Sequence, residues 1–403
     1  MPDSAILDTY ALEVKTELDS ILGYWMKNMP DEQYGGYIGR IKDDNSRDIK
    51  SEKGSVLNSR ILWTFSAAYN HTGEGQYLEY ADRAYRYFVE HFIDQVYGGV
   101  YWTLDQNGSP ADSKKQIYAQ AFAIYGLSEY YKCDPLPEIL SAAINIFQLI
   151  ENHSFDKEHG GYIEDFGRDW NQVNELSLGD KDPNKKKSMN THLHLVEAYA
   201  NLLMVWPDEK LRICLVQLMN NFADHIINKE TGHLNLFFDE EWNLKSSVVS
   251  FGHDVEAAWL LQEAAHFTGE EDLVEKFQQV SISLATAAAR GLDDDGGLWY
   301  EKDGDHLVRE KHWWPQAEAM VGFFNTWQIT NDDSFFERSL GSWRFVKTNL
   351  LDSHAGEWHW GVDEQNQPMI GQDKAGIWKC PYRNGRACME ILNRITTMGL
   401  STD

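Results

Sequence analysis

The chain has few cysteines, and they form no recognisable pattern. Its 403 residues include four, at positions 133, 214, 380 and 388, with no C-x-x-C pair among them. Neither a disulfide framework nor a zinc site is indicated, and a reducing compartment is the simplest interpretation. The N-terminus also lacks the basic and apolar segments of a signal peptide. We therefore expect a cytoplasmic protein.

Positive charge is scarce as well. The 36 Lys and Arg residues face 63 Asp and Glu residues, which gives a formal net charge of −27. Binding to nucleic acid or to an anionic membrane surface requires clustered basic side chains. No run approaches the about 18 apolar residues of a membrane-spanning helix. The sequence therefore predicts a protein that binds a neutral small molecule and has neither a nucleic-acid nor a membrane partner. As a separate expectation, we take the chain to be a monomer.

Aromatic residues, in contrast, are abundant. They make up 13% of the chain and include 15 Trp, which is more than a hydrophobic core requires. The flat faces of aromatic rings suit the C–H faces of sugars. Aromatic content thus favours a carbohydrate ligand.

A short glycine-aromatic motif recurs six times along the chain. Its clearest copies are Tyr34-Gly35-Gly36-Tyr37 and Tyr97-Gly98-Gly99-Val100-Tyr101-Trp102. The last glycine of each copy stands at positions 36, 99, 161, 232, 297 and 356. A near-constant period of this length is typical of a repeated architecture.

Two helical patterns lie between successive copies, which gives about twelve helices. The odd-numbered ones have charged faces, whereas the even-numbered ones are rich in Ala, Leu and aromatic residues and are therefore expected to be buried. This pattern predicts an all-α fold, a closed (α/α)6 barrel with short hairpin-like glycine turns, and a single domain over residues 1–403. Residues 172–188 are interpreted as a long loop that covers the barrel mouth.

Unusual polar and aromatic residues gather near the starts of the even-numbered helices, and so are expected to meet at one mouth of the barrel. They are Arg60, Tyr118, Asn190, His192, His194, His253, Glu256, Trp313, Trp314, Glu318, Arg383, Asn384 and Arg386. His192 and His194 are two residues apart and face different directions on a helix. We assign His194 to the mouth, with Glu197 behind it, and interpret His192 as structural.

Two other chemistries fit the same residues. A metal site formed by His194, His253, Glu256 and Glu318 matches no known ligand spacing, so no metal is expected. A carboxylate pair for glycoside hydrolysis would use Glu256 with Glu318 or Asp182. Trp314 and Trp378 are the best candidates for sugar platforms.

Four segments together resemble the cellobiose 2-epimerases of the N-acylglucosamine 2-epimerase superfamily. These are Asn58-Ser59-Arg60-Ile61-Leu62-Trp63, Asn190-Thr191-His192-Leu193-His194, Phe251-Gly252-His253-Asp254-Val255-Glu256 and Trp313-Trp314-Pro315-Gln316-Ala317-Glu318. The resemblance extends from about residue 10 to the C-terminus. It implies an (α/α)6 barrel and cofactor-free, reversible epimerisation at C2 of the reducing-end glucose of a β-1,4-linked disaccharide.

The resemblance also implies roles for individual residues. His253 is expected to act as an acid/base group at C2, and His194 to assist proton movement at O1 or O5, because imidazole titrates near neutral pH. Arg60 is expected to stabilise the oxyanion of an enediolate. Glu256 and Glu318 are expected to orient His253 and the sugar hydroxyls. The remaining substrate-binding candidates are Tyr118, Asp182, Asn190, Trp314 and Trp378.

One position departs from the family pattern. The resemblance places a second C2 base, a histidine, where this chain reads Pro381-Tyr382-Arg383-Asn384. Arginine keeps its proton in proteins and cannot replace that base. Three explanations follow: the chain is an inactivated variant, a single-base enzyme, or a former enzyme that only binds sugar. Because the surrounding motif is intact, we favour a recent or deliberate substitution. A mannose/glucose 2-epimerase or aldose–ketose isomerase, an (α/α)6 glycoside hydrolase and a sugar-binding protein remain alternatives.

Overall fold

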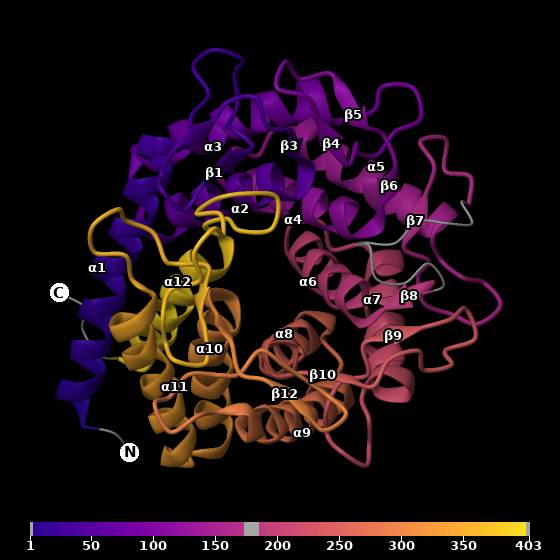
Figure 1. The fold of residues 1–403 in the computed structure, drawn as a ribbon. Helices are drawn as coiled ribbons and strands as arrows, with labels where there is room; N and C mark the ends of the chain where they lie inside the picture. Colours follow the sequence, from indigo (N-terminus) through magenta and orange to yellow (C-terminus); the bar gives the residue numbers. More distant parts are fainter. Residues whose placement is uncertain (1–2, 173–184, 400–403) are drawn as a thin grey trace.

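Twelve α-helices form two concentric rings in the computed structural model, which describes residues 3–172 and 185–399 (Figure 1). The inner ring contains α2 (Ser55–Thr72), α4 (Ile117–Cys133), α6 (Met189–Val205), α8 (Phe251–Thr268), α10 (Trp313–Thr330) and α12 (Tyr382–Thr397). The outer ring contains α1 (Ser4–Asn28), α3 (Gly75–Tyr87), α5 (Pro137–His153), α7 (Glu209–Asn221), α9 (Glu271–Ala288) and α11 (Asp333–Phe345). The predicted (α/α)6 barrel is confirmed.

The order of helix contacts explains how the barrel closes. Each inner helix packs against the next inner helix, and α12 packs against α2. Helices α3, α5, α7, α9 and α11 each pack against the inner helix that precedes them, while α1 packs against α12 at the other end of the chain (Figure 1). Inner helices approach closely where a side chain is missing: a Cβ on Gly322 of α10 would lie 2.4 Å from the carbonyl oxygen of Val255 of α8.

Burial follows the division that the sequence predicts. The inner helices are buried along most of their length, whereas the outer helices bury one face only. The large apolar side chains of that face, including Trp25 of α1 and Trp343 of α11, are almost fully buried. Burial of each such side chain stabilises the folded state by about 1.5–3 kcal/mol, because its apolar surface is removed from water.

Short antiparallel strands form a collar at the N-terminal ends of the inner helices. The sheets are β1 (Arg40–Ile41) with β2 (Arg47–Asp48); β3 (Lys53–Gly54) with β4 (Thr103–Leu104) and β5 (Pro110–Asp112); β6 (Lys115–Gln116) with β7 (Asp165–Phe166); β8 (Lys187–Ser188) with β9 (Phe237–Phe238); β10 (Val248–Ser250) with β11 (Glu301–Asp303) and β12 (His306–Val308); and β13 (Lys311–His312) with β14 (Gly361–Val362). The strand before each of α2, α4, α6, α8 and α10 pairs with a strand of the following repeat. An isolated bridge between Ile41 and Ala375 links the last repeat to the first.

Each glycine-aromatic motif forms a tight hairpin, as its sequence predicts. The residues on either side are bridged in all six repeats, as in Pro30 with Tyr37 and Ile93 with Val100. Gly36 has a φ of 61°, and a Cβ there would lie 2.5 Å from the ring of Tyr87. Only glycine satisfies both the left-handed backbone and the close approach of that ring.

An ion pair with a buried lysine joins this hairpin to the collar in five of the six repeats. The lysine and aspartate are 2.7–3.0 Å apart in the pairs Lys53–Asp31, Lys115–Asp94, Lys187–Asp156, Lys311–Asp293 and Lys374–Asp352. In the fourth repeat, Asn228 and Val249 occupy the corresponding positions, so this repeat replaces the charged pair with neutral groups. The sequence analysis did not find this pattern, because the two partners are more than 15 residues apart.

Two further predictions concern the long loop at residues 172–188 and the absence of a membrane-spanning helix. Lys187 and Ser188, which the sequence analysis places in a loop, form strand β8, because they pair with the following repeat; residues 173–184 of that loop lie outside the described part of the chain. Within residues 3–172 and 185–399, no helix is both long and apolar enough to cross a bilayer.

Candidate active site

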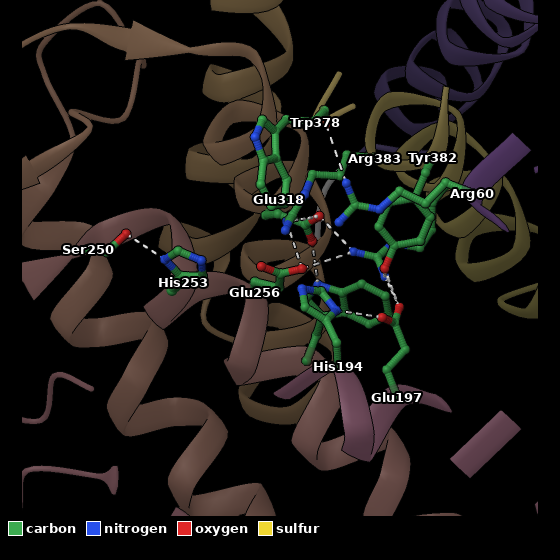
Figure 2. A network of polar contacts seen from close by, with 12 residues as sticks. Arg60, His194, Glu197, Ser250, His253, Glu256, Glu318, Trp378, Tyr382 and Arg383 are labelled. Atoms are coloured by element: carbon green, nitrogen blue, oxygen red, sulfur yellow. Dashed lines mark hydrogen bonds and ion pairs between the residues drawn. The ribbon is translucent and has the colours of Figure 1, made fainter. Parts of the chain in front are cut away.

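The N-terminal halves of the inner helices bring a buried cluster of charged residues together (Figure 2). Helices α2, α6, α8, α10 and α12 contribute three arginines and three glutamates, namely Arg60, Arg383, Arg386, Glu197, Glu256 and Glu318. Positive and negative charges are thus equal in number. A buried cluster of this kind is stable only when its charges are paired and hydrogen-bonded.

Arg383 and Arg386 of α12 bind the glutamates of α6, α8 and α10. The Nη1 atom of Arg383 lies 2.6 Å from Oε1 of Glu256 and 3.0 Å from Oε1 of Glu318. Nη2 of Arg386 lies 2.7 Å from Oε1 of Glu318, and its Nη1 contacts Glu197. Burial by itself raises the pKa of Glu256, but the neighbouring positive groups, Arg383 foremost and Arg386 with it, together outweigh burial and hold the pKa well below its usual value. Glu256 is therefore ionised.

His194 presents a free ring nitrogen to the interior of the barrel. Its Nδ1 lies 2.9 Å from Oε2 of Glu197, while its Nε2 is buried and has no hydrogen-bond partner among the residues that the structure describes. Burial lowers the pKa of His194, so the ring is neutral near pH 7. Since a carboxylate only accepts hydrogen bonds, Nδ1 carries the proton and Nε2 is left as an acceptor.

Arg60 is the cation of the cluster that has no carboxylate partner among the described residues. It donates to the Tyr118 hydroxyl over 2.7 Å and to the Trp378 carbonyl over 3.3 Å. Its guanidinium also lies 4.1 Å from the centre of the Phe122 ring. Because Arg60 is buried, its uncompensated charge is well suited to an oxygen that becomes negative.

His253 lies beside the cluster (Figure 2). Its ring centre is 4.6 Å from that of Trp314. Its Nδ1 is 2.8 Å from the Ser250 hydroxyl. Burial lowers the pKa of His253 to about 3, so the ring is neutral at pH 7. The expected orientation of His253 by Glu256 is not seen among the described contacts: Arg383 and Arg386 both bind Oε1 of Glu256, and Nδ1 of His253 is bonded to Ser250 instead.

Aromatic rings surround these polar groups. Trp314 lies below Arg383, with the guanidinium 4.6 Å from its ring centre. Trp378 is half-buried, and its ring centre lies 5.9 Å from those of both Tyr118 and Trp102. Rings around a small set of fixed polar groups are typical of a small-molecule site.

Several residues near the helix starts have structural roles instead. His192 accepts a hydrogen bond from the backbone N–H of Tyr162 over 3.0 Å, which agrees with the interpretation of His192 as structural. Asn384 donates to Glu357 over 2.7 Å, and Trp313 packs against Trp360.

The remaining predicted residues differ in what the structure shows of them. The side-chain oxygen of Asn190 is buried and has no partner in the described part of the chain, whereas Asp182 lies outside that part. Ser250 and Tyr382 were missed as members of the site. The only signal for Ser250 is its position three residues before His253 in the sequence. Among residues 3–172 and 185–399, no group of three or more His, Cys, Asp or Glu residues is arranged to hold a metal ion.

Comparison with known proteins identifies the family. The profile of the N-acylglucosamine 2-epimerase (GlcNAc 2-epimerase) family matches residues 36–380. A cellobiose 2-epimerase of Bacteroides fragilis is 46% identical over 94% of this chain and 98% of its own. The structure of a cellobiose 2-epimerase from Bacillus thermoamylovorans is 38% identical, with a TM-score of 0.93 over 96% of this chain and 99% of that chain. A D-mannose isomerase of Marinomonas mediterranea is 23% identical over 95% of this chain and 97% of its own. This chain belongs to the N-acylglucosamine 2-epimerase family.

Proposed function

We propose that this chain is a sugar 2-epimerase that acts at C2 of the reducing-end glucose of cellobiose and related β-1,4-linked disaccharides. The observation that carries the proposal is the combination of two neutral imidazoles, His194 and His253, with the uncompensated cation Arg60. The two similar proteins with the highest identity described above are both cellobiose 2-epimerases. We also propose that the chain folds as one domain, is a monomer and is located in the cytoplasm.

The chemistry follows from the acidity of the C2 proton in the ring-opened sugar. C2 is then adjacent to an aldehyde, and removal of its proton gives an enediolate. His253 takes or returns this proton, while Arg60 stabilises the negative charge on O1 and O2. His194, whose Nε2 is free to accept, moves the proton at O1 or O5. No cofactor or metal ion is required in this scheme.

Arg383 limits the reaction in the chain as it stands. Inversion at C2 requires a proton to leave from one face and return to the other. Arg383 is held between Glu256 and Glu318, and these carboxylates raise its pKa far above the physiological range. It cannot exchange protons, so His253 is the single base at C2. We therefore expect strong sugar binding and little epimerisation.

The test is NMR of cellobiose in D2O with the protein and with two variants at one position. Arg383→His supplies a base, whereas Arg383→Gln removes the charge and supplies none. We expect deuterium at C2 and formation of 4-O-β-glucosyl-mannose with Arg383→His alone. Equal activity in all three proteins would mean that His253 suffices and that the two-base scheme is wrong.

The products separate the alternatives. An aldose–ketose isomerase, which the D-mannose isomerase similarity favours, would yield a ketose as the main product. A glycoside hydrolase would release glucose; its acid/base pair is disfavoured here, because Glu256 and Glu318 are both ion-paired to arginine. A sugar-binding protein would bind cellobiose without any exchange at C2, even in the Arg383→His variant.

A further inference from the structure

A cavity lies behind the strand that precedes α8. Its volume is about 790 Å³. It is bounded by the fourth glycine-aromatic hairpin, by the sheet of β10, β11 and β12, and by the short turn η3 (Ala289–Gly291) that follows α9. We call this space the fourth-repeat cavity.

The cavity lies where the fourth repeat departs from the other five. Val249 of β10 takes the place of the collar lysine, which is 0–2% exposed in each of the other repeats. On the hairpin, His233 precedes the bridged residue Leu234, whereas glycine precedes the bridged residue in four of the other five repeats. Val249 and His233 both line the cavity. A shorter side chain on one wall thus leaves space beside an imidazole on the other.

The imidazole of His233 presents one free nitrogen to the cavity. The residue is 9% exposed, and its Nδ1 lies 2.6 Å from Oδ2 of Asp254. Its Nε2 makes no hydrogen bond with a described residue, yet it remains accessible to solvent. Since the carboxylate takes the proton on Nδ1, Nε2 of the neutral ring accepts a hydrogen bond. The hydroxyl group of a ligand can satisfy it.

The cavity also contains positive charge that is not paired. Arg290, Lys302 and Arg309 line it, and none of the three makes an ion pair with a carboxylate in residues 3–172 and 185–399. The lining includes two carboxylates, those of Glu230 and Asp305, so cations are in excess here although the whole chain has a net charge of −27. Unpaired cations around a concave site favour an anionic group.

An aromatic ring and aliphatic side chains form the rest of the wall. Trp299 is partly exposed, and Leu307 lines the cavity with it. The guanidinium of Arg309 lies 5.5 Å from the centre of the Trp299 ring, which places a cation beside this flat surface. Aromatic faces suit the C–H faces of sugars. A sugar ring that carries an anionic group therefore matches this wall.

The sheet that forms one wall separates the cavity from the candidate active site. Val249, Lys302 and Leu307 lie directly opposite one another across the three strands, so their side chains share one face. Ser250 is the next residue of β10 and points to the other face, where its hydroxyl lies 2.8 Å from Nδ1 of His253. The two sites therefore lie on opposite faces of one sheet.

We propose that the fourth-repeat cavity is a second ligand site, which binds a monosaccharide phosphate. The phosphate pairs with the cations of the cavity, one sugar hydroxyl donates to Nε2 of His233, and the C–H face of the ring packs on Trp299. Charge-assisted hydrogen bonds to phosphate are the strong contacts, and the hydroxyl and ring contacts select a sugar. This site is independent of the proposed epimerase activity.

The test uses glucose 6-phosphate, with inorganic phosphate and glucose as its two halves. Calorimetric titration of the full chain is expected to show that glucose 6-phosphate binds at least about tenfold more tightly than either half. Saturating cellobiose should leave this binding in place, because the two sites are separated by the sheet.

Three variants locate the contacts. Arg290→Gln and Lys302→Gln should each weaken the binding of glucose 6-phosphate by at least about fivefold, because each removes a charge that pairs with the phosphate. Arg86→Gln removes a charge from α3, where the side chain is 80% exposed, and should leave binding unchanged. His233→Asn keeps an N–H donor for Asp254 but removes Nε2, so it should reduce the preference for glucose 6-phosphate over inorganic phosphate.

Five results would overturn the proposal: no binding of glucose 6-phosphate, equal binding of inorganic phosphate, unchanged binding in Arg290→Gln or Lys302→Gln, an unchanged preference in His233→Asn, or displacement of glucose 6-phosphate by cellobiose. Circular dichroism of each variant checks that the fold is retained. Arg290→Gln and Lys302→Gln are expected to fold, because both side chains are exposed.

Discussion

Arg386 should be the residue whose loss destabilises the barrel most within the charged cluster. Its guanidinium bonds Glu318 at 2.7 Å, contacts Glu197 and the Tyr382 hydroxyl, and is 2% exposed. Methionine at this position would fill much of the volume but leave the carboxylates with one cation fewer. Removal of one partner from a buried ion pair typically costs about 3–5 kcal/mol, because an uncompensated charge remains. We expect a loss of this size for Arg386→Met.

The assay is urea unfolding followed by tryptophan fluorescence, with Arg86→Met as the matched control. The Arg86 side chain is 80% exposed, so its replacement should change the free energy of unfolding by about 0.5 kcal/mol or less. Adding Glu318→Gln to Arg386→Met should recover part of the loss, since it removes one of the unpaired charges. A loss below about 1 kcal/mol for Arg386→Met, or no recovery in the double variant, would refute the reasoning.

Two other predictions concern residues of the collar strands, Ser250 of β10 and Asp165 of β7. In the Arg383→His background, Ser250→Ala should slow deuterium exchange at C2 by about tenfold, because His253 loses the hydrogen bond that orients its ring. Ser247→Ala, on the exposed approach to the same strand, is the control, and equal rates in both would contradict the role of Ser250. Burial raises the pKa of Asp165 from 3.8 to about 8, so the folded state binds this proton more tightly than the unfolded state, and stability falls as pH rises through that range. Asp165→Asn should therefore raise the melting temperature more near pH 8 than near pH 4. An equal shift at the two pH values would show that Asp165 titrates normally.

Much of the fold could be predicted from local patterns in the sequence. The apolar inner helices and polar-faced outer helices follow from the period of hydrophobic residues, and the glycine turns follow from conformations that only glycine adopts. The six-fold repeat then dictates that the helix starts share one mouth. This is why Arg60, Tyr118, His194, Glu256, Glu318 and Arg383 could be assigned to one site before the structure was known.

The partners of these residues could not be predicted, because they depend on distances across the barrel. The sequence places Glu256 one helical turn from His253, yet the carboxylate bonds Arg383 and Arg386 of α12, and Ser250 holds the histidine. Charge pairing in a buried cluster is decided by which side chains meet at the barrel axis, and those come from helices far apart in the chain.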